Sequence, residues 1–390
     1  MREKKFSVIG KPLRKVDALA KTTGDTRYAD DLELSRMLYG KLLRSPLPHA
    51  RIRGVKTDRA AKLKGVYAVI TGADLPERFG IMPSTQDEEA LAGEKVRHVG
   101  DPVAAVAASS EAVAEESLRL IEVDYEPLKP ILSIEEALAS TEESERIHAW
   151  NRRANIQKAV SFEFGDVGQG FEQADQIFED TFFFQGNAHL PMEQHCALAQ
   201  YGPEDKLTIW SSTQTPHYLH RALSKVLKLP MSRIRVIAAP VGGGFGGKSD
   251  PFSHEMCASK LAMITGRPVK FTLTREETFY VHRGRHPVKM WIRTGVKNDG
   301  TLQAMHFRSF LDGGGYSSYG LATVYYTGAL QTTTHKLPAY KFEGVRVFTN
   351  KPPCGPKRGH GTPQPRFALE VHLDKIADKL GIDPVELRLK

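Results

Sequence analysis

The chain has 390 residues, 41% of them hydrophobic and 26% charged, which is the composition of a globular protein of two or three domains. Its formal net charge is +8, but the basic residues stand singly or in pairs among apolar and acidic ones, so we expect no nucleic-acid partner. No apolar run reaches the ~20 residues of a membrane span. The charged N-terminal sequence has no apolar core behind it, which predicts no secretion signal and a cytoplasmic location.

The first part of the chain, residues 1–130, predicts a small α/β domain. Strand-like RIRGV and YAVIT flank a short helix around DRAAKLK, and a further strand is predicted at Pro102–Ala107. Ser109 or Ser110 can cap the helix that follows, because acidic residues occupy its first turns. Residues 131–155, with the short helix SIEEALAS and a polar run, are predicted to connect this domain to the next.

Residues 156–390 are predicted to hold many strands. The strand RIRVIAAP leads into a glycine-rich turn, and the helix PFSHEMCASKLAMITG follows and is stopped by Gly266. Val288–Val296 and Leu302–Leu311 predict an antiparallel hairpin joined by Asn298-Asp299-Gly300. The last segment predicts a helix, a turn at Gly381 and a second helix starting at Asp383-Pro384.

The three cysteines are spread along the chain. No C-x-x-C pair occurs, so a zinc or iron–sulfur site in this chain is not expected, and buried free thiols are predicted. The cysteines are Cys196, Cys257 and Cys354.

The glycine-rich turn VGGGFGGKSD matches two nucleotide-binding patterns at once. Gly242, Gly247, Lys248 and Ser249 spell the phosphate loop G-x-x-x-x-G-K-S, and Gly242, Gly244 and Gly247 spell the dinucleotide fingerprint G-x-G-x-x-G. The predicted hairpin interrupts the βαβ order that a dinucleotide domain requires. No apolar run that ends in a magnesium-binding Asp follows either. A phosphate-loop ATPase therefore stands only as an alternative of a different class.

Four segments in fixed order resemble the molybdenum-cofactor-binding chain of the xanthine dehydrogenase/aldehyde oxidase family. They are GKPLRKVDALAKTTGDTRYADDL, STQTPH, VGGGFGGK and CGPKRGHGTPQPRFALE. The resemblance implies an α+β fold, with a small α/β hammerhead domain followed by the first part of a molybdenum-cofactor-binding domain of mixed and antiparallel sheets. It also implies a molybdenum ion on a molybdopterin, in the cytosine dinucleotide form, with iron–sulfur clusters and FAD on partner subunits.

The resemblance assigns cofactor-binding roles to residues of three of these segments. Gln214 would reach an oxygen ligand of molybdenum, and Arg358 would lie beside the pterin; no side chain would bind the metal directly. The glycines permit close backbone approach, and their N–H groups can form an anion-binding nest. The alternatives are a surface amide, a tight strand-to-helix turn and a surface arginine. The residues expected to lie against the metal centre are Gly243, Gly244, Phe245 and Gly246.

The segments HRGR (His282–Arg285), YTGAL (Tyr326–Leu330) and TNKPPCGPKRGHGT (Thr349–Thr362) resemble the family members that reduce 4-hydroxybenzoyl-CoA. Tyr326 and His360 stand where purine-oxidising relatives carry an arginine and a phenylalanine. Ser249 replaces their purine-binding glutamate. The resemblance implies reductive dehydroxylation of an aromatic CoA thioester, with Tyr326 and His360 facing the substrate.

Two alternatives to this substrate assignment stay open. One is a dehydrogenase that hydroxylates an N-heterocycle or an aldehyde. The other is that Tyr326 is an ordinary core tyrosine and His360 a structural histidine, and that neither contacts a substrate.

The glutamate that serves the family as catalytic base has no counterpart here, because no matching G-E motif occurs downstream of residue 160. We therefore expect a truncated chain, or one of a split pair completed by a second molybdopterin-binding chain, and no turnover by this chain alone. Glu193, in PMEQHCALA, is predicted to be structural or to support residues of the site without contacting the ligand itself.

Overall fold

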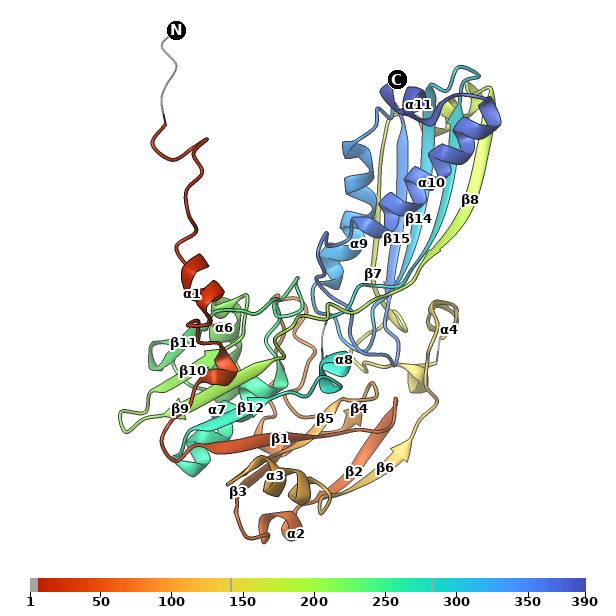
Figure 1. Ribbon diagram of the computed structural model, residues 1–390. Helices are drawn as coiled ribbons and strands as arrows, with labels where there is room; N and C mark the ends of the chain where they lie inside the picture. The colour runs from red at the N-terminus through yellow and green to blue at the C-terminus, as the bar shows by residue number, and fades with distance from the viewer. Residues whose placement is uncertain (1–5, 141, 282) are drawn as a thin grey trace.

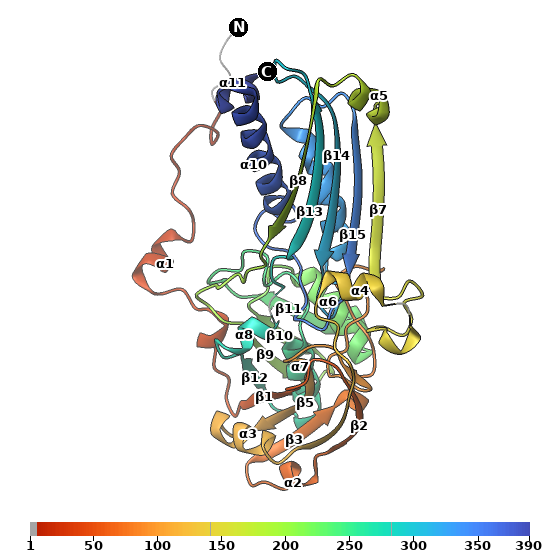
Figure 2. The ribbon, with the colours of Figure 1, turned by 90° about the vertical axis from the view of Figure 1, so that its right-hand side faces the viewer.

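The computed structural model describes residues 6–140, 142–281 and 283–390. The first five residues of the charged N-terminus and His282 of the HRGR segment lie outside the described residues. Figure 1 shows a broad body, formed mainly by the first two thirds of the chain, and an arm of long strands and helices that rises from it. Figure 2 shows the arm from the side, with its long helix α10 on one face of the sheet.

The main sheet of the body has seven strands. In spatial order they are β11 (Ile234–Ala238), β10 (Leu207–Ser211), β9 (Cys196–Tyr201), β12 (Val269–Thr272), β1 (Leu38–Arg44), β5 (Pro102–Ala108) and β3 (Val66–Thr71). β1 pairs in parallel with β12, with Leu38 beside Val269. The sheet is therefore shared between residues 1–130 and 156–390, and the predicted division at 131–155 stays a prediction.

Every residue of β5 is buried because both faces of the sheet are covered. Ala105 and Ala107 face the core under α7 (Ser253–Thr265), whereas Ala104 and Val106 face the core that contains α3 (Glu111–Leu118). Ser110 caps α3 by accepting a bond from the N–H of Val113, and Gly266 ends α7 in the left-handed conformation, as predicted.

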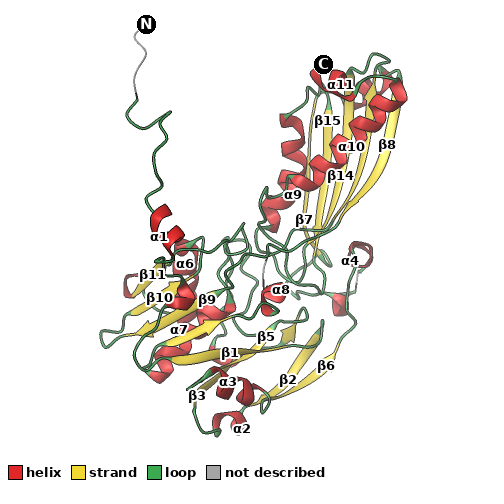
Figure 3. Ribbon diagram, viewed as in Figure 1, coloured by secondary structure: helices red, strands yellow, loops and turns green. Residues whose placement is uncertain are grey.

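The body also contains a second sheet and five further helices among the described residues. A three-stranded antiparallel sheet has the order β4 (Lys95–Val96), β2 (Ala50–Lys56) and β6 (Glu122–Pro127). The other helices outside the arm, shown in Figure 3, are α1 (Ala18–Thr23), α2 (Asp58–Ala61), α4 (Ile134–Ala139), α6 (Pro216–Leu227) and α8 (Glu277–Val281).

The arm is a five-stranded sheet in the order β7 (Ile156–Phe164), β15 (Tyr340–Val347), β14 (Leu302–Asp312), β13 (Val288–Val296) and β8 (Gln176–Phe184). β13 and β14 form the predicted antiparallel hairpin, and Gly300 in its turn has φ = 89°. β14 and β15 run parallel. The helices of the arm are α5 (Val167–Glu172), α9 (Gly320–Ala329), α10 (Pro363–Leu380) and α11 (Pro384–Leu389).

The helix, turn and second helix predicted for the last segment of the sequence are confirmed. α10 ends at Gly381 in the left-handed conformation, and Asp383 caps α11 by accepting bonds from the N–H groups of Val385 and Glu386. α9 and α10 pack on the arm sheet and bury an apolar core that includes Phe342 and Leu369.

Mixed seven- and five-stranded sheets, an antiparallel three-stranded sheet and packed helices confirm the predicted α+β class. The three cysteines are free and buried. Within the described ranges, no helix is long and apolar enough to cross a lipid bilayer.

Candidate functional site

The candidate residues lie on loops that leave the main sheet or return from the arm. Residues 212–215 link β10 to α6, and the glycine loop (Gly242–Ser249) lies between β11 and α7. Residues 355–361 lie between β15 and α10 and return from the arm, while residues 185–195 run from β8 of the arm to β9 of the body. Hydrogen bonds between these loops bring together residues that are distant in sequence.

Gln214 is bound to the glycine loop by three hydrogen bonds. Its side-chain oxygen Oε1 accepts from the N–H of Gly246 at 3.1 Å and from the N–H of Lys248 at 3.2 Å. Its own N–H donates to the carbonyl oxygen of Lys248 at 2.8 Å. These two N–H donors identify the bound atom as the oxygen Oε1, so the amide NH₂ of this exposed side chain is not used by the loop and can donate to a ligand.

The glycine loop has a backbone that larger residues could not adopt without strain. Gly243 and Gly246 have φ values of 102° and 96°. A Cβ on Gly244 would fall 2.4 Å from Oε1 of Gln214, and one on Gly246 would fall 2.5 Å from the carbonyl oxygen of Pro356. Phe245 itself has φ = 52°, which is unusual for a residue with a side chain, and it is 46% exposed.

Arg358 adjoins the same loop through its backbone. Its N–H donates to the carbonyl oxygen of Phe245 at 2.9 Å, and its own carbonyl oxygen accepts a bond from Nη2 of Arg285. The Arg358 side chain is exposed. Gln214, the glycine loop and Arg358 therefore form one contiguous surface.

Tyr326 and His360 form an adjoining cluster, since His360 lies two residues after Arg358. Their rings meet edge to face with centroids 5.9 Å apart, and Tyr319 contacts the His360 ring in the same way at 5.9 Å. Nε2 of His360 is hydrogen-bonded to the hydroxyl of Thr323. The same hydroxyl donates to the carbonyl oxygen of Tyr319 at 3.2 Å. With the hydroxyl proton directed at that carbonyl, the hydroxyl accepts from Nε2–H, and in this tautomer Nδ1 of His360 is an acceptor.

Burial lowers the pKa of His360 to about 4, with the charges of Arg285 and Arg346 acting in the same direction. The imidazole is therefore neutral at pH 7. Tyr326 on α9 is 38% exposed, so its phenol stands at the surface beside the neutral ring.

Lys248, the lysine of the phosphate-loop pattern, does not point outward. Its side chain is 1% exposed, and Nζ lies 2.6 Å from Oε2 of Glu193. Burial lowers the pKa of Lys248, and the Glu193 carboxylate opposes that shift. A phosphate-loop lysine must reach the β- and γ-phosphates of a nucleotide, so this geometry contradicts the ATPase alternative.

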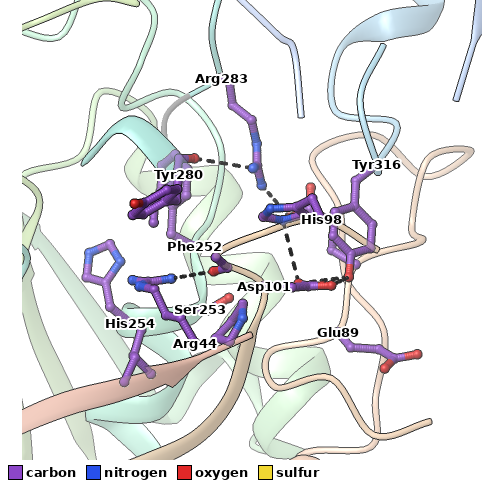
Figure 4. A pocket seen from close by; sticks show the side chains of 15 residues that line it. Arg44, Glu89, His98, Asp101, Phe252, Ser253, His254, Tyr280, Arg283 and Tyr316 are labelled. Atoms are coloured by element: carbon purple, nitrogen blue, oxygen red, sulfur yellow. Dashed lines mark hydrogen bonds and ion pairs between the residues drawn. The ribbon is translucent and has the colours of Figure 1, made fainter. Parts of the chain in front are cut away.

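A separate polar cavity of about 30 Å³ lies between the body and the arm loops, and none of the candidate residues lines it. Figure 4 shows Asp101 between His98 and Tyr316, with Arg44 and His254 on another side. Nη2 of Arg44 and Nδ1 of His254 are buried and have no hydrogen-bond partner among the described residues. The volume suits about two water molecules, so this cavity is too small for a substrate.

Several residues that position the site were not singled out from the sequence. His189 and His195 bind the carbonyl oxygens of Pro356 and Gly247 through their Nε2 atoms, at 2.8 and 3.0 Å. Arg285 holds the Arg358 carbonyl, and Thr323 holds His360. Their positioning roles have no local sequence signal, because each hydrogen-bond partner is distant in sequence. Over the residues that the structure describes, no group of three or more His, Cys, Asp or Glu could hold a metal ion.

Two family models match the chain. That of the molybdopterin cofactor-binding domain matches residues 147–390. That of the a/b hammerhead domain of aldehyde oxidase and xanthine dehydrogenase matches residues 23–129.

Curated relatives match nearly the whole chain. One probable xanthine dehydrogenase subunit, from Bacillus subtilis, is 39% identical over 386 residues, which are 98% of this chain and 51% of the relative. The nicotinate dehydrogenase large molybdopterin subunit of Eubacterium barkeri is 38% identical over 393 residues, which are 99% of this chain and 89% of the relative. The chain thus spans about half of the first relative and most of the second.

Solved structures share the fold. Aldehyde oxidoreductase from Desulfovibrio gigas superposes with a TM-score of 0.89 at 32% identity, over 96% of this chain and 42% of that one. Quinoline 2-oxidoreductase from Pseudomonas putida 86 gives a TM-score of 0.89 at 31% identity, over 98% of this chain and 50% of that one.

Proposed function

The chain belongs to the aldehyde oxidase and xanthine dehydrogenase family of molybdopterin-binding oxidoreductases, and on that premise we propose that it forms one side of the active site of a multi-subunit N-heterocycle dehydrogenase. The proposed reaction replaces a ring C–H by C–OH, with the oxygen taken from water and two protons and two electrons released. The relative that matches along most of its own length is a nicotinate dehydrogenase subunit, which supports a heteroaromatic substrate.

The residues present fit a molybdopterin. The observation that carries the proposal is the commitment of the Gln214 oxygen to two loop N–H groups, which leaves the neutral amide NH₂ as an outward donor. Beside it, the bare backbone at Gly243–Gly246 admits a close ligand. We assign cofactor contacts to Gln214, the Gly243–Gly246 backbone and Arg358. When bound, the molybdenum pterin supplies the two-electron redox chemistry.

On the substrate side, we propose that Tyr326 and His360 orient the aromatic ring. His360 is neutral at pH 7, and its Nδ1 can accept a proton or a hydrogen bond, while the Tyr326 phenol can donate one. Ser249 carries no charge, so a purine held by a glutamate at this position is not the proposed substrate.

A second candidate reaction is the reductive dehydroxylation of 4-hydroxybenzoyl-CoA. The edge-to-face pairing of Tyr326 with His360 favours it, because a phenol and an imidazole can bind the ring hydroxyl that leaves. Here the substrate takes up two electrons and two protons and releases water.

The proposal includes partners. Electrons must leave the site, so we propose an iron–sulfur subunit and an FAD subunit, and a molybdopterin in the cytosine dinucleotide form. Gln214, Phe245, Tyr326 and Arg358 are exposed, which supports closure of the site by a second molybdopterin-binding chain that carries the catalytic base. We propose the cytoplasm as the location of the complex.

The variant Gln214→Glu tests the role of the amide. A glutamate keeps an oxygen acceptor for the N–H groups of Gly246 and Lys248 but removes the NH₂ donor. We expect an unchanged urea unfolding midpoint and a roughly tenfold to hundredfold loss of molybdenum retention or of turnover. Molybdenum is measured by elemental analysis of the assembled complex, and turnover by oxidation of nicotinate with a dye acceptor.

Gln200→Glu, at an exposed position on β9, is the matched control and should retain both properties. Reduction of 4-hydroxybenzoyl-CoA in place of nicotinate oxidation would select the second candidate. A wild-type complex without molybdenum, purified from cells that make the cofactor, would refute the proposed function.

A further inference from the structure

The two ends of the glycine loop are bound to one carboxylate. At the start of the loop, the N–H of Gly242 donates to Oε2 of Glu193 at 2.8 Å, and the N–H of Glu193 donates to the Gly242 carbonyl oxygen at 3.2 Å. At the end of the loop, Nζ of Lys248 donates to the same Oε2 at 2.6 Å. Glu193 therefore closes the loop into a ring of hydrogen bonds.

The pair is well shielded from solvent. The side chain of Lys248 is 1% exposed and that of Glu193 is 10% exposed. A Cβ on Gly242 would fall 2.7 Å from Cβ of Glu193, so the loop and the segment that carries Glu193 are in direct contact. The charge interaction is correspondingly little screened by water and salt.

Lys248 also connects this pair to the candidate site. Its N–H and its carbonyl oxygen are both bound to Gln214, and its side chain is bound to Glu193. Lys248 therefore connects the buried carboxylate of Glu193 to Gln214, through its side chain on one side and its backbone on the other. A lysine in this sequence pattern ordinarily binds phosphate, but here its Nζ is directed at a buried carboxylate.

We infer that Glu193 and Lys248 are positioning residues, which clamp the glycine loop and so fix the direction of the Gln214 amide. The importance of this clamp for the cofactor rests on the proposed function, but the clamp itself is a property of the chain. It assigns the lysine of VGGGFGGK a role in shaping the site rather than in contacting a ligand.

The test uses Glu193→Gln, Lys248→Met and the double variant in the full chain within its complex. Amide hydrogen exchange over residues 242–249 reports on the loop directly. We expect each single change to accelerate exchange there at least tenfold and to lower molybdenum content. Glu277→Gln breaks another shielded ion pair, with Arg44 at 2.9 Å, and should leave exchange in the loop unchanged.

The double variant separates a clamp from a merely stabilising ion pair. It leaves no charge unpaired, so its urea midpoint should recover toward wild type, because a lone buried charge is what destabilises each single variant. The clamp predicts that loop exchange nevertheless stays fast. Recovery of both stability and slow exchange in the double variant would overturn the inference.

Slow exchange in both single variants would overturn it as well. If a single variant does not fold, Glu193→Asp replaces it, because it retracts the carboxylate by one methylene. Amide hydrogen exchange over residues 242–249 should again be accelerated. A wild-type complex that lacks molybdenum, but whose loop responds as described, would refute the proposed function and leave the clamp intact.

Discussion

Glu255, the third residue of α7, is a carboxyl group whose ionisation is coupled to folding. It is 1% exposed and accepts bonds from the N–H of Phe252 at 2.7 Å and from Oγ of Ser211 at 2.5 Å. Burial nevertheless raises its pKa to about 7. Between its usual value and about 7, the folded protein binds a proton that the unfolded chain does not. This group therefore lowers stability as pH rises through that window.

Glu255→Gln should remove that pH dependence. At pH 8 the variant should be more stable than wild type by on the order of 3 kcal/mol, since the pKa rises from its usual 4.5 to about 7 and each pKa unit corresponds to about 1.4 kcal/mol. At pH 5 the two should be similar. Urea unfolding at pH 5, 6, 7 and 8 measures the slope. Glu204→Gln, at an exposed site, is the control, and an unaltered slope in Glu255→Gln would contradict the argument.

At this scale the sequence motifs pointed to residues that the structure places on one surface, and their role in binding a cofactor stays a prediction. Gln214, Phe245 and Arg358 were found through motifs, and hydrogen bonds now connect their loops. The direction of Lys248 could not be predicted, because Glu193 lies far from it in sequence and the letters G-K-S are the same in either case. His360 was expected to face the substrate, and its burial, which makes the imidazole neutral at pH 7, could not be predicted from the motif.

The elements themselves were largely predictable because their signals are local. Asn298-Asp299-Gly300 predicts the β13–β14 turn, and Gly266 and Gly381 end α7 and α10. Partner strands were not predictable. The two strands around HLPMEQ enter different sheets, β8 in the arm and β9 in the body, since pairing depends on contacts remote in sequence.

Two glycines at element ends allow a matched test of backbone space. Gly165 follows β7 with φ = 68°, and a Cβ there would fall 2.3 Å from the carbonyl oxygen of Pro338. Gly266 follows α7 with φ = 62° and open space. Gly266→Ala should cost about 1 kcal/mol, for the left-handed backbone alone. Gly165→Ala should cost about 3 kcal/mol, because the backbone of β7 or its neighbour must move.

Chemical unfolding measures both glycine variants. Equal costs would show that β7 shifts freely along the edge of the arm sheet.

The whole molecule is more integrated than its two-domain sequence suggests. β1 and β5 of the first part lie in one sheet with β9 and β12 of the second, and Leu38 and Leu42 share a core with Met256 and Leu261 of α7. The resemblance predicted the class of each part, and the α+β fold is confirmed. The shared sheet was not predicted, because β12 is short and carries no mark of its partner.

A fragment of residues 1–150 should therefore not fold alone. It would expose the β1 edge and the core face that α7 covers, and so bind a hydrophobic dye and show poorly dispersed amide NMR signals. Co-expression with residues 151–390 should restore cooperative unfolding. A dispersed spectrum from the isolated fragment would show that the first part is independent of β12.

Because Leu38 pairs with Val269, β1 cannot complete its pairing during translation until β12 has been synthesised. At 5–20 residues per second, roughly ten to fifty seconds separate the emergence of the two strands from the ribosome. β5 can pair with one edge of β1 early. Until β12 is available, the backbone groups at the other edge stay unpaired and can pair with strands of other chains. The yield of native protein should depend on how fast the ribosome reaches β12 and on chaperones that shield β1 meanwhile.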